Sequence, residues 1–204
     1  MNYIHPTSII DPSVVLGDNN YIGPFCYITG NTTIGDNNRF EAYCSIGTPA
    51  EHRDHFTSDK GKTIIGNNNI IREFVTIHSG TITSTVLKDQ ITILNHSHIA
   101  HDTYIENKAI ISANVTFAGH CHVMEGANVA MGSICHQFQI IGAYSMVGMG
   151  SVVTKKTNIE PGKIYIGSPS KFLKLNNIGL ERNNITPKKL SEFVEHYNTL
   201  INGI

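Results

Sequence analysis

Residues 93–153 read ILNHSHIAHDTYIENKAIISANVTFAGHCHVMEGANVAMGSICHQFQIIGAYSMVGMGSVV and carry the strongest periodic signal of the chain. Every sixth residue, counted from the first, is apolar or cysteine, eleven times in succession. At an apolar content of 40%, such a run arises by chance about once in 20,000 placements, so the period reflects the structure. The eleven positions are Ile93, Ile99, Ile105, Ile111, Phe117, Val123, Val129, Cys135, Ile141, Val147 and Val153.

The same period runs through the N-terminal half of the chain. A helix needs an apolar spacing near 3.6 and an amphipathic strand a spacing of 2, so neither produces a period of six. Very short strands joined by tight corners do produce it, and Gly and Asn clusters such as residues 35–38 suit these corners because both residues tolerate left-handed backbone angles. The earlier ladder positions are Ile4, Ile10, Leu16, Ile22, Ile28, Ile34, Phe40, Ile46, Ile65, Ile71 and Ile77.

Three hexads are expected to close one triangular coil of 18 residues, with stacked coils roughly 4.8 Å apart. The 22 ladder positions then predict about seven coils. The ladder pauses at residues 47–64 and 78–92, which we predict to be loops leaving the prism, and such loops often carry function. We assign residues 1–168 to this β-helix domain and residues 169–204 to a C-terminal α-helical extension.

A helix is predicted from about Pro187, because Thr186 can cap it and proline suits the first helical turn. Six apolar residues at helical spacing form one stripe, which we interpret as a packing or oligomer surface. They are Leu190, Phe193, Val194, Tyr197, Leu200 and Ile201.

Composition excludes several classes of protein. The 204 residues include 15 basic and 16 acidic side chains, a net charge of −1, which argues against broad nucleic-acid binding. An apolar content of 40% is too high for a disordered chain. No apolar run approaches the roughly 20 residues of a membrane helix. The N-terminal residues lack a signal sequence, so we expect a cytoplasmic protein without an integral membrane segment.

Seven of the eleven histidines lie between residues 78 and 136, and none occupies a ladder position. Because one coil is 18 residues, His101 should stack beneath Gly119 and Gln137 along one edge. Asp102 should form the adjacent row with His120 and Phe138. The seven are His78, His96, His98, His101, His120, His122 and His136.

This arrangement suits acyl transfer. A histidine side chain has a reference pKa near 6.5 and can take a proton from an attacking hydroxyl or amine at pH 7. A neighbouring carboxylate can fix its tautomer, for which Asp102 is the candidate, and the Gly119 amide can stabilise an oxyanion. No serine or cysteine shares the row of His101, so direct attack without a covalent intermediate is favoured. The alternative interpretation is a cluster of surface histidines that takes part in no reaction.

Four segments resemble the signature segments of the bacterial UDP-N-acetylglucosamine O-acyltransferases. They are IREFVTIH at 71–78, HIAHD at 98–102, AGH at 118–120 and HQF at 136–138. The resemblance covers roughly residues 4–184. It implies a left-handed parallel β-helix that assembles into a homotrimer with active sites between neighbouring prisms. It also implies transfer of a 3-hydroxyacyl chain from acyl carrier protein to the sugar 3-hydroxyl, at the start of lipid A synthesis.

The same resemblance implies roles for individual residues. His101 would be the general base, Asp102 its partner, and the Gly119 amide the oxyanion donor. Asn176 and Arg182 match positions near the pantetheine and nucleotide phosphates. No metal or permanently bound cofactor is implied, and the co-substrate is a phosphopantetheine thioester. The residues expected to line the donor and nucleotide-sugar cleft are His78, His98, His120, His136 and Gln137.

Departures from the family pattern bear on which sugar and which acyl group the chain uses. The family usually has an Asp-x-Lys sugar-binding motif in the first protruding loop, and residues 48–56, TPAEHRDHF, show no clear equivalent. Met149 matches a position that is small in long-chain enzymes, and Met131 replaces a nearby glycine of the family. The C-terminal helical region is also shorter. We therefore expect a short acyl group, from acyl carrier protein or coenzyme A.

Two other functions stay open. One is N-acylation of a dTDP- or UDP-linked 3-amino sugar by acyl-CoA, as in surface-polysaccharide or O-antigen synthesis. The other is a zinc-dependent enzyme like the γ-class carbonic anhydrases, because His96 and His101 have the five-residue offset of two such ligands. Eight basic side chains within residues 155–189 could attract an acidic carrier protein or coenzyme A phosphates, or form an ordinary solvated surface.

Overall fold

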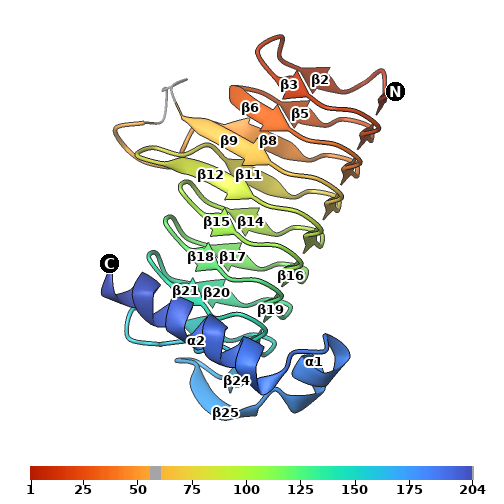
Figure 1. Ribbon diagram of the computed structural model, residues 1–204. Helices are drawn as coiled ribbons and strands as arrows, with labels where there is room; N and C mark the ends of the chain where they lie inside the picture. Colours follow the sequence, from red (N-terminus) through yellow and green to blue (C-terminus); the bar gives the residue numbers. More distant parts are fainter. Residues whose placement is uncertain (56–60, 204) are drawn as a thin grey trace.

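Most hexads of the sequence form a two-residue strand followed by a tight corner, and successive coils stack into one column (Figure 1). The computed structural model describes residues 1–55 and 61–203. The strands make three parallel sheets, one on each face of the prism, and each strand pairs with the strand one coil away. The predicted parallel β-helix is therefore confirmed.

Sheet A contains ten strands. They are β1 (Tyr3–Ile4), β4 (Tyr21–Ile22), β7 (Arg39–Phe40), β10 (Ile70–Ile71), β13 (Thr92–Ile93), β16 (Ile110–Ile111), β19 (Asn128–Val129), β22 (Met146–Val147), β24 (Lys163–Ile166) and β25 (Lys171–Leu175). Strand β25 pairs antiparallel with β24, and the other pairs between the described strands are parallel.

Sheet B contains eight strands and sheet C seven. Those of sheet B are β2 (Ile9–Ile10), β5 (Tyr27–Ile28), β8 (Ser45–Thr48), β11 (Thr76–His78), β14 (His98–Ile99), β17 (Thr116–Phe117), β20 (Ile134–Cys135) and β23 (Val152–Val153). Those of sheet C are β3 (Val15–Leu16), β6 (Asn31–Ile34), β9 (Lys62–Ile65), β12 (Ser84–Leu87), β15 (Tyr104–Ile105), β18 (His122–Val123) and β21 (Ile140–Ile141).

The predicted number of seven coils is wrong, because the chain makes about nine. The second predicted loop, 78–92, is shorter than expected: the chain leaves the prism only at residues 79–83, and β12 returns with Leu87 buried in the core. The pattern also continues beyond Val153, since Ile159 bridges to Ile141 and Tyr165 is buried. In the first predicted loop, 47–64, strands β8 and β9 reach inward to Thr48 and Lys62, and residues 56–60 lie outside the described part.

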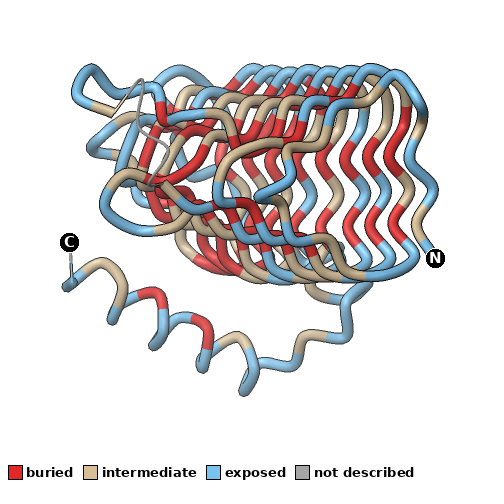
Figure 2. Tube along the Cα trace, turned by 90° about the horizontal axis from the view of Figure 1, so that it is seen from above, coloured by how far each residue is buried: buried red, intermediate tan, exposed pale blue. Residues whose placement is uncertain are grey.

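The ladder side chains fill the prism, as predicted. From Ile22 to Val153 they are essentially inaccessible to solvent, and the inward rows alternate with exposed corners (Figure 2). Burying an isoleucine or phenylalanine side chain contributes about 1.5–3 kcal/mol, so this column dominates stability. At the N-terminal end, Ile4 is exposed because no further coil covers it.

The predicted α-helical extension, residues 169–204, begins instead with strand β25 of sheet A, and helix α2 packs against sheet C. Helix α1 (Asn177–Arg182) is followed by α2 (Pro187–Asn202), which begins where predicted, with the Thr186 hydroxyl accepting a hydrogen bond from the Lys189 amide. Phe193 and Tyr197 of α2 are buried in a second apolar cluster. None of the helices within residues 1–55 and 61–203 is long and apolar enough to cross a membrane.

Candidate active site

The predicted stacking of His101 beneath Gly119 is present at the corner between sheets B and C. Residues 101 and 102 join β14 to β15, and residues 119 and 120 join β17 to β18 one coil further on. Backbone hydrogen bonds link the rows directly, from the His120 amide to the His101 carbonyl (3.0 Å) and from the Phe138 amide to the Gly119 carbonyl (3.1 Å). Vertical alignment therefore brings these polar groups onto one edge.

His101 and Asp102 form a close pair. The Nδ1 atom of His101 lies 2.7 Å from Oδ2 of Asp102, and the Asp102 side chain is 0% exposed while that of His101 is 12% exposed. Because an ionised carboxylate can only accept, Nδ1 carries the proton and the neutral ring presents its lone pair at Nε2. Among the described residues, none hydrogen-bonds to that Nε2. The ring is thus held in the tautomer that a general base requires.

The Asp102 carboxylate is saturated with donors. It accepts hydrogen bonds from three successive backbone amides, from two threonine hydroxyls and from His101. Burial alone would raise the pKa of this carboxyl group, but the hydrogen bonds from Thr81, His101 and Thr83 outweigh it and hold the pKa well below its usual range. Asp102 therefore remains ionised near neutral pH.

Gly119 is required by the ring beneath it. A Cβ atom at this position would lie 2.5 Å from Cε1 and 2.7 Å from Nε2 of His101, so any side chain would collide with the imidazole. Within the described residues the Gly119 amide donates to no acceptor, because the corner turns it out of the sheet ladder. The glycine leaves both a free N–H group and open space beside Nε2.

Aromatic rings surround the pair. His120 packs edge-on against His101, with ring centroids 5.1 Å apart, and stacks on Phe138 at 4.5 Å. Its Nε2 lies 3.7 Å from Asp102 Oδ2. Burial lowers the pKa of His120, although the Asp102 charge opposes this shift. His52, from the first protruding loop, approaches His101 with a centroid distance of 6.0 Å.

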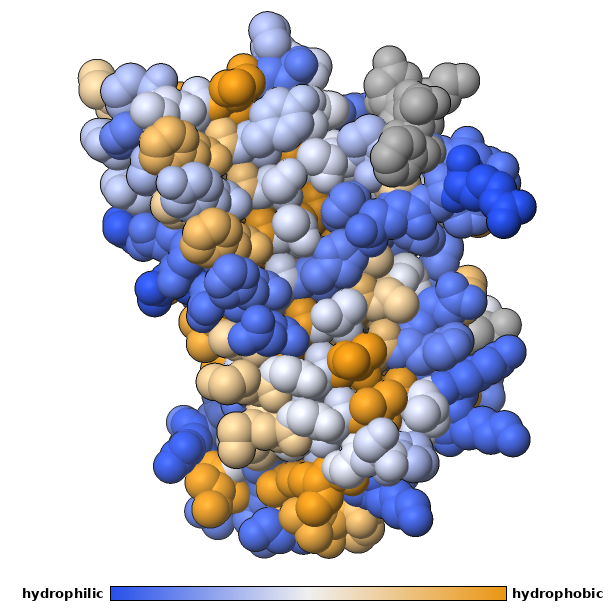
Figure 3. Space-filling model, turned by 180° about the vertical axis from the view of Figure 1, so that it is seen from behind, coloured by the Kyte–Doolittle hydropathy of each residue, from blue (hydrophilic) through white to orange (hydrophobic). Residues whose placement is uncertain are grey.

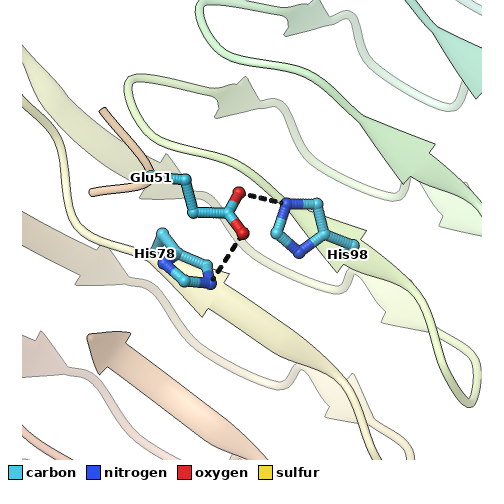
Figure 4. Close-up of side chains that lie close together, drawn as sticks. All are labelled: Glu51, His78 and His98. Carbon is cyan, nitrogen blue, oxygen red and sulfur yellow. Dashed lines mark ion pairs between the residues drawn. The ribbon is translucent and has the colours of Figure 1, made fainter. Parts of the chain in front are cut away.

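Glu51 joins His78 and His98 on the outward side of sheet B (Figure 4). Its carboxylate lies 2.7 Å from Nε2 of His98 and 3.7 Å from Nε2 of His78. The other ring nitrogens contact the Thr76 hydroxyl (2.8 Å, from His98) and the Pro49 carbonyl (2.8 Å, from His78). Burial lowers the pKa of His98 against the opposing effect of Glu51. Glu51 was not among the site residues predicted from the sequence, because its partners are 27 and 47 residues away.

Four further predicted residues lie on two different edges of the prism. His136 and Gln137 extend the His101 edge by one coil and are exposed. Met149, 76% exposed, and Met131 lie instead at the corner between sheets A and B. Apolar side chains are exposed among polar ones on the back of the molecule (Figure 3). Within one chain, neither methionine shares an edge with His101.

Asn176 and Arg182 line a pocket of about 580 Å³ on sheet A. Outward side chains of β16, β19 and β22 line it together with α1. Asn176 also caps α1, since its side chain accepts from the Gly179 amide and donates to the Tyr144 carbonyl. The structure therefore does not bring this pair to His101 within one chain.

Within residues 1–55 and 61–203, two groups of side chains have metal-ligand geometry. Glu51, His78 and His98 offer ligand atoms within 4.8 Å of one another and could hold a cation, as could His101, Asp102 and His120 by distance alone. In the second group the lone pairs of Asp102 are already used by six donor groups. His96, the other histidine of the five-residue offset, stacks on Phe74 along the edge between sheets A and B.

Comparison with known proteins identifies the family of the chain. The bacterial transferase hexapeptide model (six repeats) matches residues 13–48. The acyl-acyl-carrier-protein–UDP-N-acetylglucosamine O-acyltransferase of Pseudomonas savastanoi pv. phaseolicola is 36% identical, over 98% of this chain and 84% of that protein. The chain belongs to the UDP-N-acetylglucosamine O-acyltransferase family. It is therefore an acyltransferase.

Other members of the family differ in how much of them the chain spans. The enzyme of the same name from Burkholderia lata is 37% identical over 73% of this chain, but only 58% of that protein is covered. The structure of Francisella novicida UDP-N-acetylglucosamine acyltransferase superimposes with a TM-score of 0.81 at 29% identity, covering 95% of this chain and 78% of that one. The chain is thus shorter than these family members.

Proposed function

We propose that this chain transfers an acyl group from a phosphopantetheine thioester, preferably acyl carrier protein, to the 3-hydroxyl of UDP-N-acetylglucosamine. The observation that carries the proposal is the His101–Asp102 pair, whose Nε2 accepts no hydrogen bond from the described residues and lies directly under Gly119. The relatives' names supply the donor and the acceptor, and this chain's residues supply the chemistry.

In the proposed mechanism, Nε2 of His101 removes the proton from the sugar hydroxyl as its oxygen attacks the thioester carbonyl carbon. The carbonyl oxygen becomes an oxyanion that the Gly119 amide can stabilise, a contribution worth a few kcal/mol. When the carbon–sulfur bond breaks, protonated His101 returns the proton to the leaving thiolate. The products are the acylated sugar and a free pantetheine thiol, with no covalent enzyme intermediate.

The donor is proposed to carry a short 3-hydroxyacyl chain. Met131 and Met149 present flexible apolar side chains at the corner between sheets A and B, where a small residue would leave a groove. They can meet an acyl group held at His101 only if the edge of a neighbouring copy supplies them. We therefore propose a homotrimer with substrates bound between prisms, with Asn176 and Arg182 near the phosphates. His78, His98, His120, His136 and Gln137 would contact the sugar and donor.

The decisive experiment offers short and long 3-hydroxyacyl donors, on acyl carrier protein and on coenzyme A, to UDP-N-acetylglucosamine and to a dTDP-linked 3-amino sugar. We expect turnover with the first acceptor and short chains, and loss of turnover in His101→Asn by at least about a hundredfold. The matched control is His122→Asn, which changes a histidine on sheet C that also contacts a carboxylate. Preference for the amino sugar would establish N-acylation instead, and full activity of His101→Asn would remove the proposed base.

Chain-length choice is tested separately. Met149→Gly should extend the usable chain by several carbons without changing affinity for the nucleotide sugar. An unchanged length preference in Met149→Gly and in the double variant with Met131→Gly would show that these methionines do not limit the groove. Ile134→Ala, on the outward face of sheet B, controls for a general loosening of the surface.

A further inference from the structure

The short loop at residues 79–83 is folded around the Asp102 carboxylate. The amides of Thr81, Ile82 and Thr83 all donate to it, at 3.0, 3.1 and 2.7 Å respectively. The hydroxyls of Thr81 and Thr83 donate to it as well, at 2.6 and 2.9 Å. This loop leaves the prism between β11 and β12. Its first two amides, of Ser79 and Gly80, donate to the Thr48 and Lys62 carbonyls, and the next three hold this carboxylate.

The loop is built for that position. A Cβ atom at Gly80 would lie 1.9 Å from the Thr83 carbonyl oxygen, so only glycine lets the chain turn back this sharply. Asp102 itself occupies a left-handed corner with φ of 58°, and its amide donates to the Thr85 hydroxyl at 2.9 Å. The loop at residues 79–83 and the corner at Asp102 therefore hold each other in place through these hydrogen bonds.

The two threonine hydroxyls bind different oxygens of Asp102. The Thr81 hydroxyl donates to Oδ2, which is also the oxygen that faces Nδ1 of His101 at 2.7 Å. The Thr83 hydroxyl donates to Oδ1, which does not contact His101. One threonine hydroxyl therefore binds the carboxylate oxygen that also faces the imidazole, and the other hydroxyl binds the opposite oxygen.

We propose that Thr81 is a positioning residue for the reaction, acting on His101 through Oδ2 of Asp102, and that Thr83 anchors the opposite oxygen. The proposal rests on the proposed role of the His101–Asp102 pair. A hydroxyl that donates to Oδ2 draws negative charge away from it and fixes its direction. Thr81 thereby sets how strongly the carboxylate stabilises the protonated imidazole that forms during catalysis.

The test compares Thr81→Val with Thr83→Val, each of which removes one hydroxyl and keeps the shape of the side chain. Without the Thr81 hydroxyl, Oδ2 keeps more charge for His101, so the protonated ring becomes more stable. The NMR titration midpoint of His101 should therefore rise by about half a pH unit, where one full unit corresponds to 1.36 kcal/mol. In Thr83→Val the rise should be less than half as large.

Catalysis should report the same difference. In Thr81→Val the acid limb of the kcat/KM profile should move up together with the titration midpoint, while KM for the nucleotide sugar stays constant. Thr81→Ser, which retains the hydroxyl, should restore both values. Thr81→Ala removes the same hydroxyl but adds no branched apolar side chain. It should therefore show the same rise in the His101 midpoint, and this checks that the rise in Thr81→Val does not come from a distorted loop.

Equal midpoint shifts in the Thr81 and Thr83 variants, or none in either, would overturn the proposal. The NMR titration needs no substrate, which separates this inference from the proposed function. A shifted midpoint in a protein without acyltransferase activity would keep the role of Thr81 and remove the function. An unshifted midpoint in Thr81→Val and Thr81→Ala, beside an inactive His101→Asn, would do the reverse.

Discussion

Three histidine–carboxylate pairs within the described residues are 2.7 Å apart, and two of them, on neighbouring parts of the prism, differ in their surroundings. His101 and Asp102 lie 2.7 Å apart at the corner between sheets B and C, and His122 and Glu106 lie 2.7 Å apart on sheet C. His101 has a glycine above it, whereas His122 is in register between Tyr104 and Ile140 on the neighbouring strands. His122 uses its Nε2 atom for the carboxylate, whereas His101 uses Nδ1 and its Nε2 has no hydrogen-bond partner in the described part of the chain.

The carboxylates differ as much as the rings. Asp102 receives six donor groups and is fully buried, whereas Glu106 receives His122, one backbone amide from Glu125 and a distant contact at 3.6 Å from His196. A contact between histidine and carboxylate is therefore not sufficient for a base. What distinguishes the first pair is access to the outer ring nitrogen and the number of groups that fix the carboxylate.

The largest expected effect separates the two pairs by activity. Asp102→Asn should lower kcat by at least about a hundredfold, because an amide can hold His101 in the wrong tautomer. Glu106→Gln should leave kcat within about twofold. Steady-state kinetics on protein checked by circular dichroism measures both, and similar losses in the two variants would mean that the comparison does not identify the catalytic pair.

The ladder made much of the fold predictable, because burial every sixth residue has one simple geometric solution. Ile93 to Val153 are buried as expected, and the helix at Pro187 begins where its capping residue indicated. The coil count failed for a physical reason: a loop of arbitrary length resets the frame without interrupting the stack. Leu87 stands ten residues after Ile77 and therefore fell outside the search, although it occupies the next inward position.

The site was predictable only where stacking by 18 residues applies. That rule aligned His101 with Gly119 and Asp102 with His120. It could not reveal the hydrogen bonds that hold the Asp102 carboxylate, because the donors are backbone amides and hydroxyls of a loop that departs from the repeat. Glu51 was missed for the same reason, since a protruding loop brings it to His78 and His98.

The next effect concerns acid stability. The folded-state pKa of Asp102 lies below the ordinary value near 3.9, so its contribution to the free energy of unfolding is present above that pH and is lost as the pH falls below it. Asp102→Asn should cost at least about 2 kcal/mol at pH 6, the usual scale of a hydrogen bond to a charged group. The difference from wild type should shrink toward pH 3, as followed by urea unfolding.

Glu106 supplies the comparison for this measurement. Burial raises its pKa, but the hydrogen bond and charge of His122 outweigh this and lower it. Because fewer donors hold Glu106, Glu106→Gln should cost less than Asp102→Asn at pH 6 and show a weaker pH dependence. A larger loss for Glu106→Gln would reverse the order of the two carboxylates.

The smallest effect is expected at His196, the α2 residue that reaches Glu106. Its side chain is half exposed and its Nε2 lies 3.6 Å from the carboxylate, so His196→Ala should cost less than about 0.5 kcal/mol. Phe193→Ala on the same helix should cost about 3 kcal/mol, because it empties the buried contact with Tyr144. Thermal unfolding of the two variants measures both. If His196→Ala were as destabilising as Phe193→Ala, the His122–Glu106 pair would hold α2 against sheet C. That pair would then have a structural role that the His101–Asp102 pair lacks.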